Sequence, residues 1–341
     1  IKQPRLWSPE SPQLYQVTAQ LRDARSDSLL DELRLPLGLR WFRFSADSGF
    51  FLNGKPYKLI GVNRHQDFAG LGNAVPASLQ RRDIELIKEM GANFLRIAHY
   101  PQSPAVLEMC DRLGILTSVE IPIVNRITES EAFYETCLQM QQEMIWQNYN
   151  HPSVVIWAYM NEVLLRLPFD PEGERYQQYA AEVTALAQRI EALTRQADPY
   201  RYTMIPNHGK MERYQEARLT EIPMIVGWNL YQGWYGGKFS GFGEFLDRHR
   251  EELPHKPVIV TEYGGGADPR IRTDQPRRFD FSMEWNNRLH EAYLAAVQER
   301  PFVTGALVWN FADFHSESRL DSEPHINSKG LMTLDRQPKD T

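Results

Sequence analysis

Two glutamates, Glu162 and Glu262, are the strongest candidates for chemistry because each follows a short apolar run. Glu162 ends the run VVIWAYMNE that starts at Val154, and Glu262 ends PVIVTE, which starts at Pro257. Such runs are typical of strands buried on both faces, so each predicts a parallel strand that carries a carboxylate at its end. A pair of carboxylates could cleave a glycosidic bond, which requires a proton donor and a nucleophile or base on opposite sides of that bond.

The elements that must position these acids form a repeating strand and helix pattern from Phe50 onward. Eight strand candidates occur: Tyr57–Val62, Phe94–Ala98, Ile115–Ile121, Val154–Asn161, Tyr202–Ile205, Met224–Tyr231, Val258–Tyr263 and Gly305–Phe311. Helical stretches separate them: Ser78–Met90, Pro104–Leu113, Ser130–Tyr149, Glu172–Ala197, Phe242–Glu251 and Glu284–Glu299. This alternation predicts an α/β fold, a (β/α)8 TIM barrel over residues 47–341. An open dinucleotide-binding sheet is disfavoured because no GxGxxG follows the first strand.

Residues 1–46 have a different texture, with alternating polar and apolar positions in Leu14–Leu21 and Leu39–Phe44 and the turn-forming DARSDS between them. This alternation predicts antiparallel strands. Two or three strands cannot bury a sandwich core alone. We therefore assign residues 1–46 to the C-terminal strands of an immunoglobulin-like β-sandwich and expect earlier strands to precede Ile1.

The composition of the chain disfavours several classes of binding partner. The chain has 341 residues, 42% hydrophobic content and a net charge of −6 with no long basic stripe, so we expect a soluble globular protein that does not bind nucleic acid. No apolar stretch approaches the roughly 18 to 20 residues of a membrane span, so no membrane association is expected. Cys110 and Cys137 have no zinc-binding spacing, and no cofactor is expected. A homo-oligomer is compatible with the sequence, which assigns no compartment.

Polar and aromatic residues gather at the predicted strand ends, where the active site of a TIM barrel lies. The candidates for binding substrate there are His65, Arg96, His99, Asn161, Asn229, Tyr231 and Trp309. Each has a structural alternative: Glu162 could form an ion pair with Arg64 or Arg96, the histidines could be plain hydrogen-bonding residues, and Trp309 could fill the barrel top. No HxH or HExxH spacing occurs, so no metal site is predicted.

Several segments resemble glycoside hydrolase family 2, which includes β-galactosidases, β-glucuronidases and β-mannosidases. The similar segments are LWSPESPQLY (Leu6–Tyr15), LNGKPYKLIGVNRHQD (Leu52–Asp67), LRIAHYPQSP (Leu95–Pro104), GILTSVEIP (Gly114–Pro122), NHPSVVIWAYMNEV (Asn150–Val163), VTEYG (Val260–Gly264) and ALVWNFADF (Ala306–Phe314). They follow the family's order and cover nearly the whole chain.

The resemblance implies a retaining mechanism in which Glu162 is the general acid/base and Glu262 the nucleophile. Retention needs the two carboxyl groups about 5 to 5.5 Å apart. Arg96 is expected to keep Glu262 ionised, with Tyr231 as a further donor, whereas burial and the charge of Glu262 should keep Glu162 protonated. The family also implies that Asn161 binds the sugar 2-hydroxyl.

The resemblance leads to two substrate predictions. The segments YGGGADPRIR (Tyr263–Arg272) and RFDFSMEW (Arg278–Trp285) look most like bacterial family members described as β-galactosidases, so the leading expectation is exo-acting removal of terminal β-D-galactose. The alternative is a β-glucuronidase or β-galacturonidase in which Asn327 and Lys329 bind the uronate carboxylate. A third reading, a non-catalytic carbohydrate-binding barrel, is disfavoured by the intact pair of glutamates.

Overall fold

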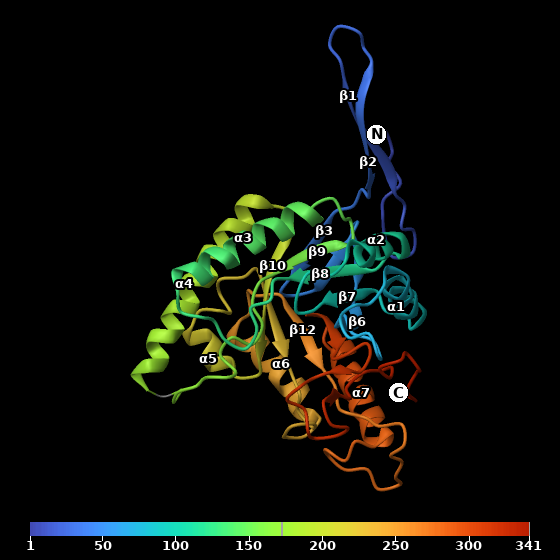
Figure 1. The fold of residues 1–341 in the computed structure, drawn as a ribbon. Helices are drawn as coiled ribbons and strands as arrows, with labels where there is room; N and C mark the ends of the chain where they lie inside the picture. Colours follow the sequence, from blue (N-terminus) through green and yellow to red (C-terminus); the bar gives the residue numbers. More distant parts are fainter. Residues whose placement is uncertain (172, 341) are drawn as a thin grey trace.

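The computed structural model describes residues 1–171 and 173–340, and its centre is a closed barrel of eight parallel strands (Figure 1). The strands are β6 (Leu59–Arg64), β7 (Phe94–Ile97), β8 (Leu116–Glu120), β9 (Val154–Ala158), β10 (Tyr202–His208), β11 (Ile225–Asn229), β12 (Val258–Tyr263) and β13 (Val303–Val308). They pair in the order β10-β11-β12-β13-β6-β7-β8-β9. Every predicted strand overlaps one of them, so the predicted TIM barrel is confirmed.

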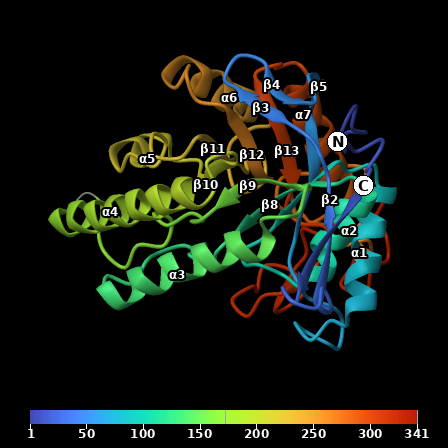
Figure 2. The same ribbon diagram turned by 90° about the horizontal axis from the view of Figure 1, so that it is seen from above.

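Helices cover the outside of the barrel (Figure 2). They are α1 (Ala77–Glu89), α2 (Pro104–Leu113), α3 (Glu131–Asn148), α4 (Glu174–Ala197), α5 (Met211–Glu216), α6 (Ser240–Glu252) and α7 (Met283–Gln298). The helix predicted over 172–197 is α4, and residue 172 lies outside the described residues. Short α5 was not predicted. No helix in the described ranges is long and apolar enough to cross a membrane.

A three-stranded antiparallel sheet closes the N-terminal end of the barrel. Its strands are β3 (Phe42–Ser45), β4 (Gly49–Leu52) and β5 (Lys55–Tyr57). Phe44, Phe50 and Leu52 are buried in one apolar cluster with the first residues of several barrel strands. The rings of Phe44 and Tyr202, which begins β10, lie 4.7 Å apart between centroids. This packing leaves the opposite end of the barrel for the site.

The remaining N-terminal strands form a hairpin of β1 (Tyr15–Arg22) and β2 (Leu29–Leu37) that projects away from the barrel (Figure 1). The DARSDS turn joins β1 to β2, a strand that was not predicted, whereas the predicted strand Leu39–Phe44 overlaps β3 and pairs with β4. The two predicted strands within residues 1–46 therefore belong to different sheets. The assignment of residues 1–46 to a sandwich domain stays a prediction.

Candidate active site

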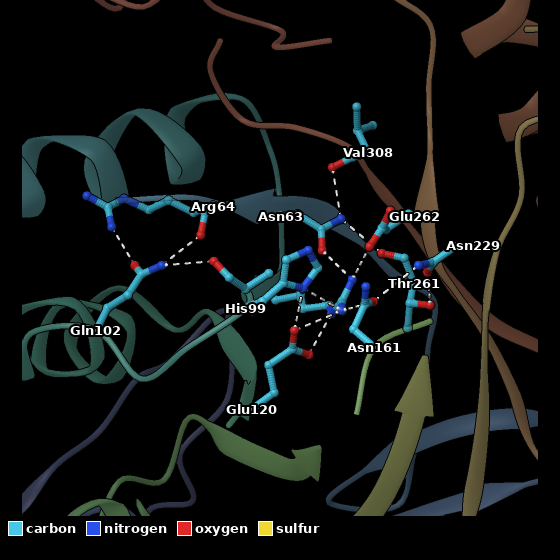
Figure 3. Close-up of polar contacts among 12 residues, drawn as sticks. Asn63, Arg64, His99, Gln102, Glu120, Asn161, Asn229, Thr261, Glu262 and Val308 are labelled. Carbon is cyan, nitrogen blue, oxygen red and sulfur yellow. Dashed lines mark hydrogen bonds and ion pairs between the residues drawn. The ribbon is translucent and has the colours of Figure 1, made fainter. Parts of the chain in front are cut away.

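The C-terminal ends of the barrel strands open into a cavity of about 1220 Å3. Most of the predicted site residues line it: His65, His99, Asn161, Glu162, Asn229, Tyr231, Glu262, Trp309 and Asn327. Arg96 and Lys329 are buried beside it rather than in its lining. The fold therefore brings residues from six barrel strands and their following loops to one place. Figure 3 shows His99, Asn161, Asn229 and Glu262 among them.

Glu262, on β12, is held by donors on both carboxylate oxygens. Arg96 Nη1 donates to Oε1 at 2.8 Å, and the Tyr231 hydroxyl donates to Oε2 at 2.8 Å. The contacts expected from the sequence are therefore present. Gly264, with a φ of +150°, allows the chain to turn after β12 against Trp309, because a Cβ at this glycine would lie 2.8 Å from the Trp309 carbonyl oxygen.

Arg96 is the centre of a fully buried polar network. Its guanidinium donates to both carboxylate oxygens of Glu120 at 2.9 Å, to Asn63 Oδ1 at 3.1 Å and to Asn161 Oδ1 at 2.8 Å. Burial acts to lower the pKa of Arg96, but the charges of Glu120 and Glu262 outweigh it and raise the pKa above its usual value. Arg96 therefore stays cationic, which stabilises the ionised form of Glu262.

Glu162 has a different environment. It lies four residues beyond the end of β9 and has a φ of +51°, a left-handed backbone conformation that is rare outside glycine. Its N–H donates to the carbonyl oxygen of Pro206 in β10 at 2.9 Å, which holds this conformation. Burial and the negative charge of Glu262 raise the pKa of Glu162 to about 8, so its carboxyl group is mostly protonated at neutral pH.

A chain of polar side chains, Thr261, Asn229 and Asn161, fixes the orientation of Asn161 (Figure 3). Asn161 Oδ1 accepts from Arg96 and, at 3.2 Å, from Asn229 Nδ2, while Asn229 Oδ1 accepts from the Thr261 hydroxyl at 2.6 Å. Because the oxygen of Asn161 is occupied by two donors, its NH2 group is left for the cavity that the residue lines.

Aromatic rings form another wall. Trp309 stacks on His99 with 4.9 Å between ring centroids, and His65 stacks on Phe314 at 4.3 Å. His99 Nδ1 also donates to Glu120 Oε1 at 2.7 Å. One face of Trp309 is thus covered by His99, so only its other face or its edge could contact a sugar. Burial, followed by smaller effects that include the charges of Arg96 and Arg64, lowers the pKa of His65 well below its usual value, so this ring is neutral.

Asn327 and Lys329 lie together at the cavity on the segment after β13. Asn327 belongs to β15 (Ile326–Asn327), which pairs with β14 (Phe314–His315), and its Oδ1 accepts from the Lys329 N–H at 3.3 Å. The Lys329 side chain is buried, with Nζ 5.0 Å from the ring centroid of Tyr235. Across residues 1–171 and 173–340, no carboxylate forms an ion pair with it. Burial lowers the pKa of Lys329 to about 7.

Lys339, a second buried lysine, differs from Lys329 because it has an anionic partner. Lys339 Nζ forms an ion pair with Asp313 at 2.8 Å and donates to the carbonyl oxygens of Ala267 and Ser328. Asp313 in turn accepts from the N–H of Gly330. Lys339 thus braces the loop that carries Lys329, whereas Lys329 has no such anionic partner among the residues that the structure describes.

Several residues in or beside the cavity were not predicted as site residues. Asn63 and Glu120 stand at strand ends, a signal that could have found them, and their role as partners of Arg96 required the fold. Further lining residues lie on loops and have no sequence signal, among them Asn125, Arg166, Lys210, Tyr235, Arg319 and Asp321. Within the described ranges, no three histidine, cysteine or acidic residues are grouped so that they could hold a metal ion.

The chain matches two descriptions of one protein family. "Glycosyl hydrolases family 2, TIM barrel domain" matches residues 45–341, and "Glycosyl hydrolases family 2" matches residues 1–40. The chain therefore belongs to glycoside hydrolase family 2, which confirms the resemblance seen in its sequence motifs.

Individual proteins that are similar to this chain give a more specific comparison than the family does. A Bacteroides fragilis protein named β-glucuronidase is 36% identical, over 99% of this chain and 48% of its own length. A crystal structure of Bacteroides uniformis β-glucuronidase has a TM-score of 0.96 and 46% identity, over 99% of this chain and 40% of that one. A further structure, with the same TM-score and identity, is B. uniformis β-glucuronidase 2 covalently bound to cyclophellitol-6-carboxylate aziridine. This chain spans about half or less of the length of these relatives.

The β-galactosidase prediction was wrong, because the relatives at 36% and 46% identity are named β-glucuronidases. The physical reason lies in the segments on which it depended. None of the residues 264–285 lines the cavity that holds Glu162 and Glu262. Part of this stretch, Arg277, Arg278 and Trp285, lines a separate cavity. Similarity there carries no information about the sugar that the site would bind.

Proposed function

We propose that this chain is the catalytic part of a retaining β-glucuronidase, which removes terminal β-D-glucuronic acid from its substrates. Glu162 protonates the departing oxygen while Glu262 attacks the anomeric carbon and forms a glycosyl-enzyme. Glu162, now ionised, then takes a proton from the water that releases the sugar. The free NH2 group of Asn161 is placed to donate to the sugar 2-hydroxyl, a hydrogen bond that strengthens in the transition state.

The observation that carries the uronate specificity is the buried Lys329 amine without an anionic partner. A buried cation is costly unless it is paired, and its pKa of about 7 reflects that cost. A substrate carboxylate would supply the missing charge and would raise this pKa. Asn327, which lines the cavity two residues away, offers an amide donor to the same group. The named relatives and the carboxylate-bearing inhibitor bound to one of them support this choice.

The test is the initial hydrolysis rate of matched 4-nitrophenyl β-D-glucuronide, β-D-galacturonide and β-D-galactoside by the full chain and by Lys329→Gln. We expect the glucuronide to be the best substrate. Loss of a buried charged contact to a ligand costs about 2 to 5 kcal/mol, so Lys329→Gln should lower kcat/KM for the glucuronide at least thirtyfold. Hydrolysis of the uncharged galactoside, where measurable, should change little.

Lys55→Gln is the matched control, because Lys55 lies in β5 at the closed end of the barrel and is exposed. A chain that prefers galactoside, or a Lys329→Gln variant with an unchanged preference for uronides, would contradict the proposal. A preference for galacturonide would keep the role of Lys329 and replace the sugar with its 4-epimer.

A further inference from the structure

The end of the cavity formed by the loops after β8, β9 and β10 carries two exposed cations. Arg166 follows β9 and Lys210 follows β10, and both line the cavity. Neither forms an ion pair with a carboxylate in the part of the chain that the structure describes. Val124 and Asn125 complete this end without adding an acidic group.

These cations lie on the side of the proposed proton donor. Arg166 is four residues beyond Glu162, and its positive charge acts on that carboxyl group by lowering its pKa against the larger effect of burial. Lys210 is two residues beyond His208, the last residue of β10, and the hydrogen bond from the Glu162 N–H to Pro206 ties the segment after β9 to β10. The departing group of a substrate must contact Glu162, so it lies next to Arg166 and Lys210.

The uronate-binding lysine lies across the barrel. In the closed order of strands, β13 is four places from β9, and Lys329 belongs to the segment after β13. The charges at the two ends differ as well. Arg319, the other arginine of the cavity lining, pairs with Asp321 at 3.0 Å and also donates to the Tyr235 hydroxyl. Arg166 and Lys210 therefore provide unneutralised positive charge at the end where the leaving group departs.

We propose that this end of the cavity is a subsite for an acidic leaving group, a sugar residue that carries a sulfate or a carboxylate. The inference rests on the proposed function and extends it from the sugar that is removed to the sugar that is left behind. The cavity, at about 1220 Å3, is larger than the usual 300 to 1,000 Å3 of a small-molecule site, which leaves room for a second ring. Positive charge on the walls of a cleft also attracts anionic ligands from solution.

The experiment uses two disaccharides, β-D-glucuronosyl-(1→3)-N-acetylglucosamine with and without a 6-sulfate, which share the same leaving oxygen. We expect the full chain to have a higher kcat/KM for the sulfated compound. An exposed charge pair is worth up to about 1 kcal/mol, so Arg166→Gln and Lys210→Gln should each lower the ratio of the two kcat/KM values about two- to fivefold. The double variant should bring the ratio close to one. The ratio should also fall as NaCl is raised from low to about 0.5 M, because exposed charges are screened.

A matched pair of aryl glucuronides, with 3-carboxyphenyl and 3-carbamoylphenyl leaving groups, separates the sources of charge. Preference for the sulfated sugar without preference for the carboxylated phenol supports a sugar subsite, whereas preference for the phenol alone overturns that part of the proposal. Arg81→Gln, an exposed arginine of α1 outside the cavity, is the control and should leave all ratios unchanged.

The two proposals fail in different ways. A chain that cleaves neither glucuronide, charged or uncharged, contradicts the proposed β-glucuronidase. A chain that cleaves both equally well, or whose double variant keeps the preference for sulfate, contradicts only the acidic subsite.

Discussion

Glu162 and Glu262 stand at the same end of one barrel, yet their surroundings differ in nearly every respect. Glu262 accepts hydrogen bonds from Arg96 and Tyr231, and Arg96 is fixed by Glu120. Glu162 has no ion pair in the described part of the chain, has a left-handed backbone, and has a pKa of about 8. The proposed mechanism uses this difference, with Glu262 as the nucleophile and Glu162 as the proton donor.

The largest expected loss of turnover comes from removing the carboxyl group of Glu262. Glu262→Ala should lower kcat for 4-nitrophenyl β-D-glucuronide about 10^4-fold or more, because no other group can form the glycosyl-enzyme. Arg96 keeps its paired contacts to Glu120, so the variant should remain folded, with a thermal unfolding midpoint close to that of the parent. A variant that retained parental turnover would remove Glu262 from the mechanism.

A smaller effect, dependent on the substrate, is expected from removing the acid. Glu162→Ala should cost about 10^2- to 10^4-fold on a glucuronide with a poor leaving group such as methanol. A 2,4-dinitrophenyl leaving group needs little protonation, so the rate of its release should fall far less. The measurement is the burst and steady-state release of each leaving group. Equal losses for both substrates would place the proton donor elsewhere.

The smallest effect is a change in pH dependence. In the proposed mechanism Glu162 must be protonated in the free enzyme, so its ionisation should lower kcat/KM for a poor leaving group tenfold per pH unit above about pH 8. Lys329 loses its charge above about pH 7 and should add an earlier decline for uronides. In Glu162→Ala with the 2,4-dinitrophenyl substrate, only the decline near pH 7 should remain. If the limb near pH 8 persisted there, another group would be responsible for it.

The barrel was predictable because strands buried on both faces have apolar sequences, which here end at polar residues. Val154 to Glu162 and Val258 to Glu262 carry both the strand and the reactive group, so fold and candidate acids came from the same signal. The contact of Arg96 with Glu262 could also be expected, since both stand at strand ends.

Loops and pairings were harder to predict. β2 was missed, and the pairing of Leu39–Phe44 with β4 was not foreseen, because alternation identifies a strand without naming its partner. Arg166 and Lys210 follow the strands without periodicity, so only the fold shows that they share a cavity. Lys329 was found as a sequence pair with Asn327, but its lack of an anionic partner is a property of the folded chain.

The sheet of β3, β4 and β5 has a kinetic consequence. Phe44, Phe50 and Leu52 add a further buried layer beneath the side chains that fill the barrel interior, so the described part of the chain leaves no passage through the barrel. In the proposed reaction, the leaving group, the incoming water and the released sugar all pass through one mouth. Free glucuronate therefore occupies the same place as the next substrate, and the enzyme should be subject to competitive product inhibition.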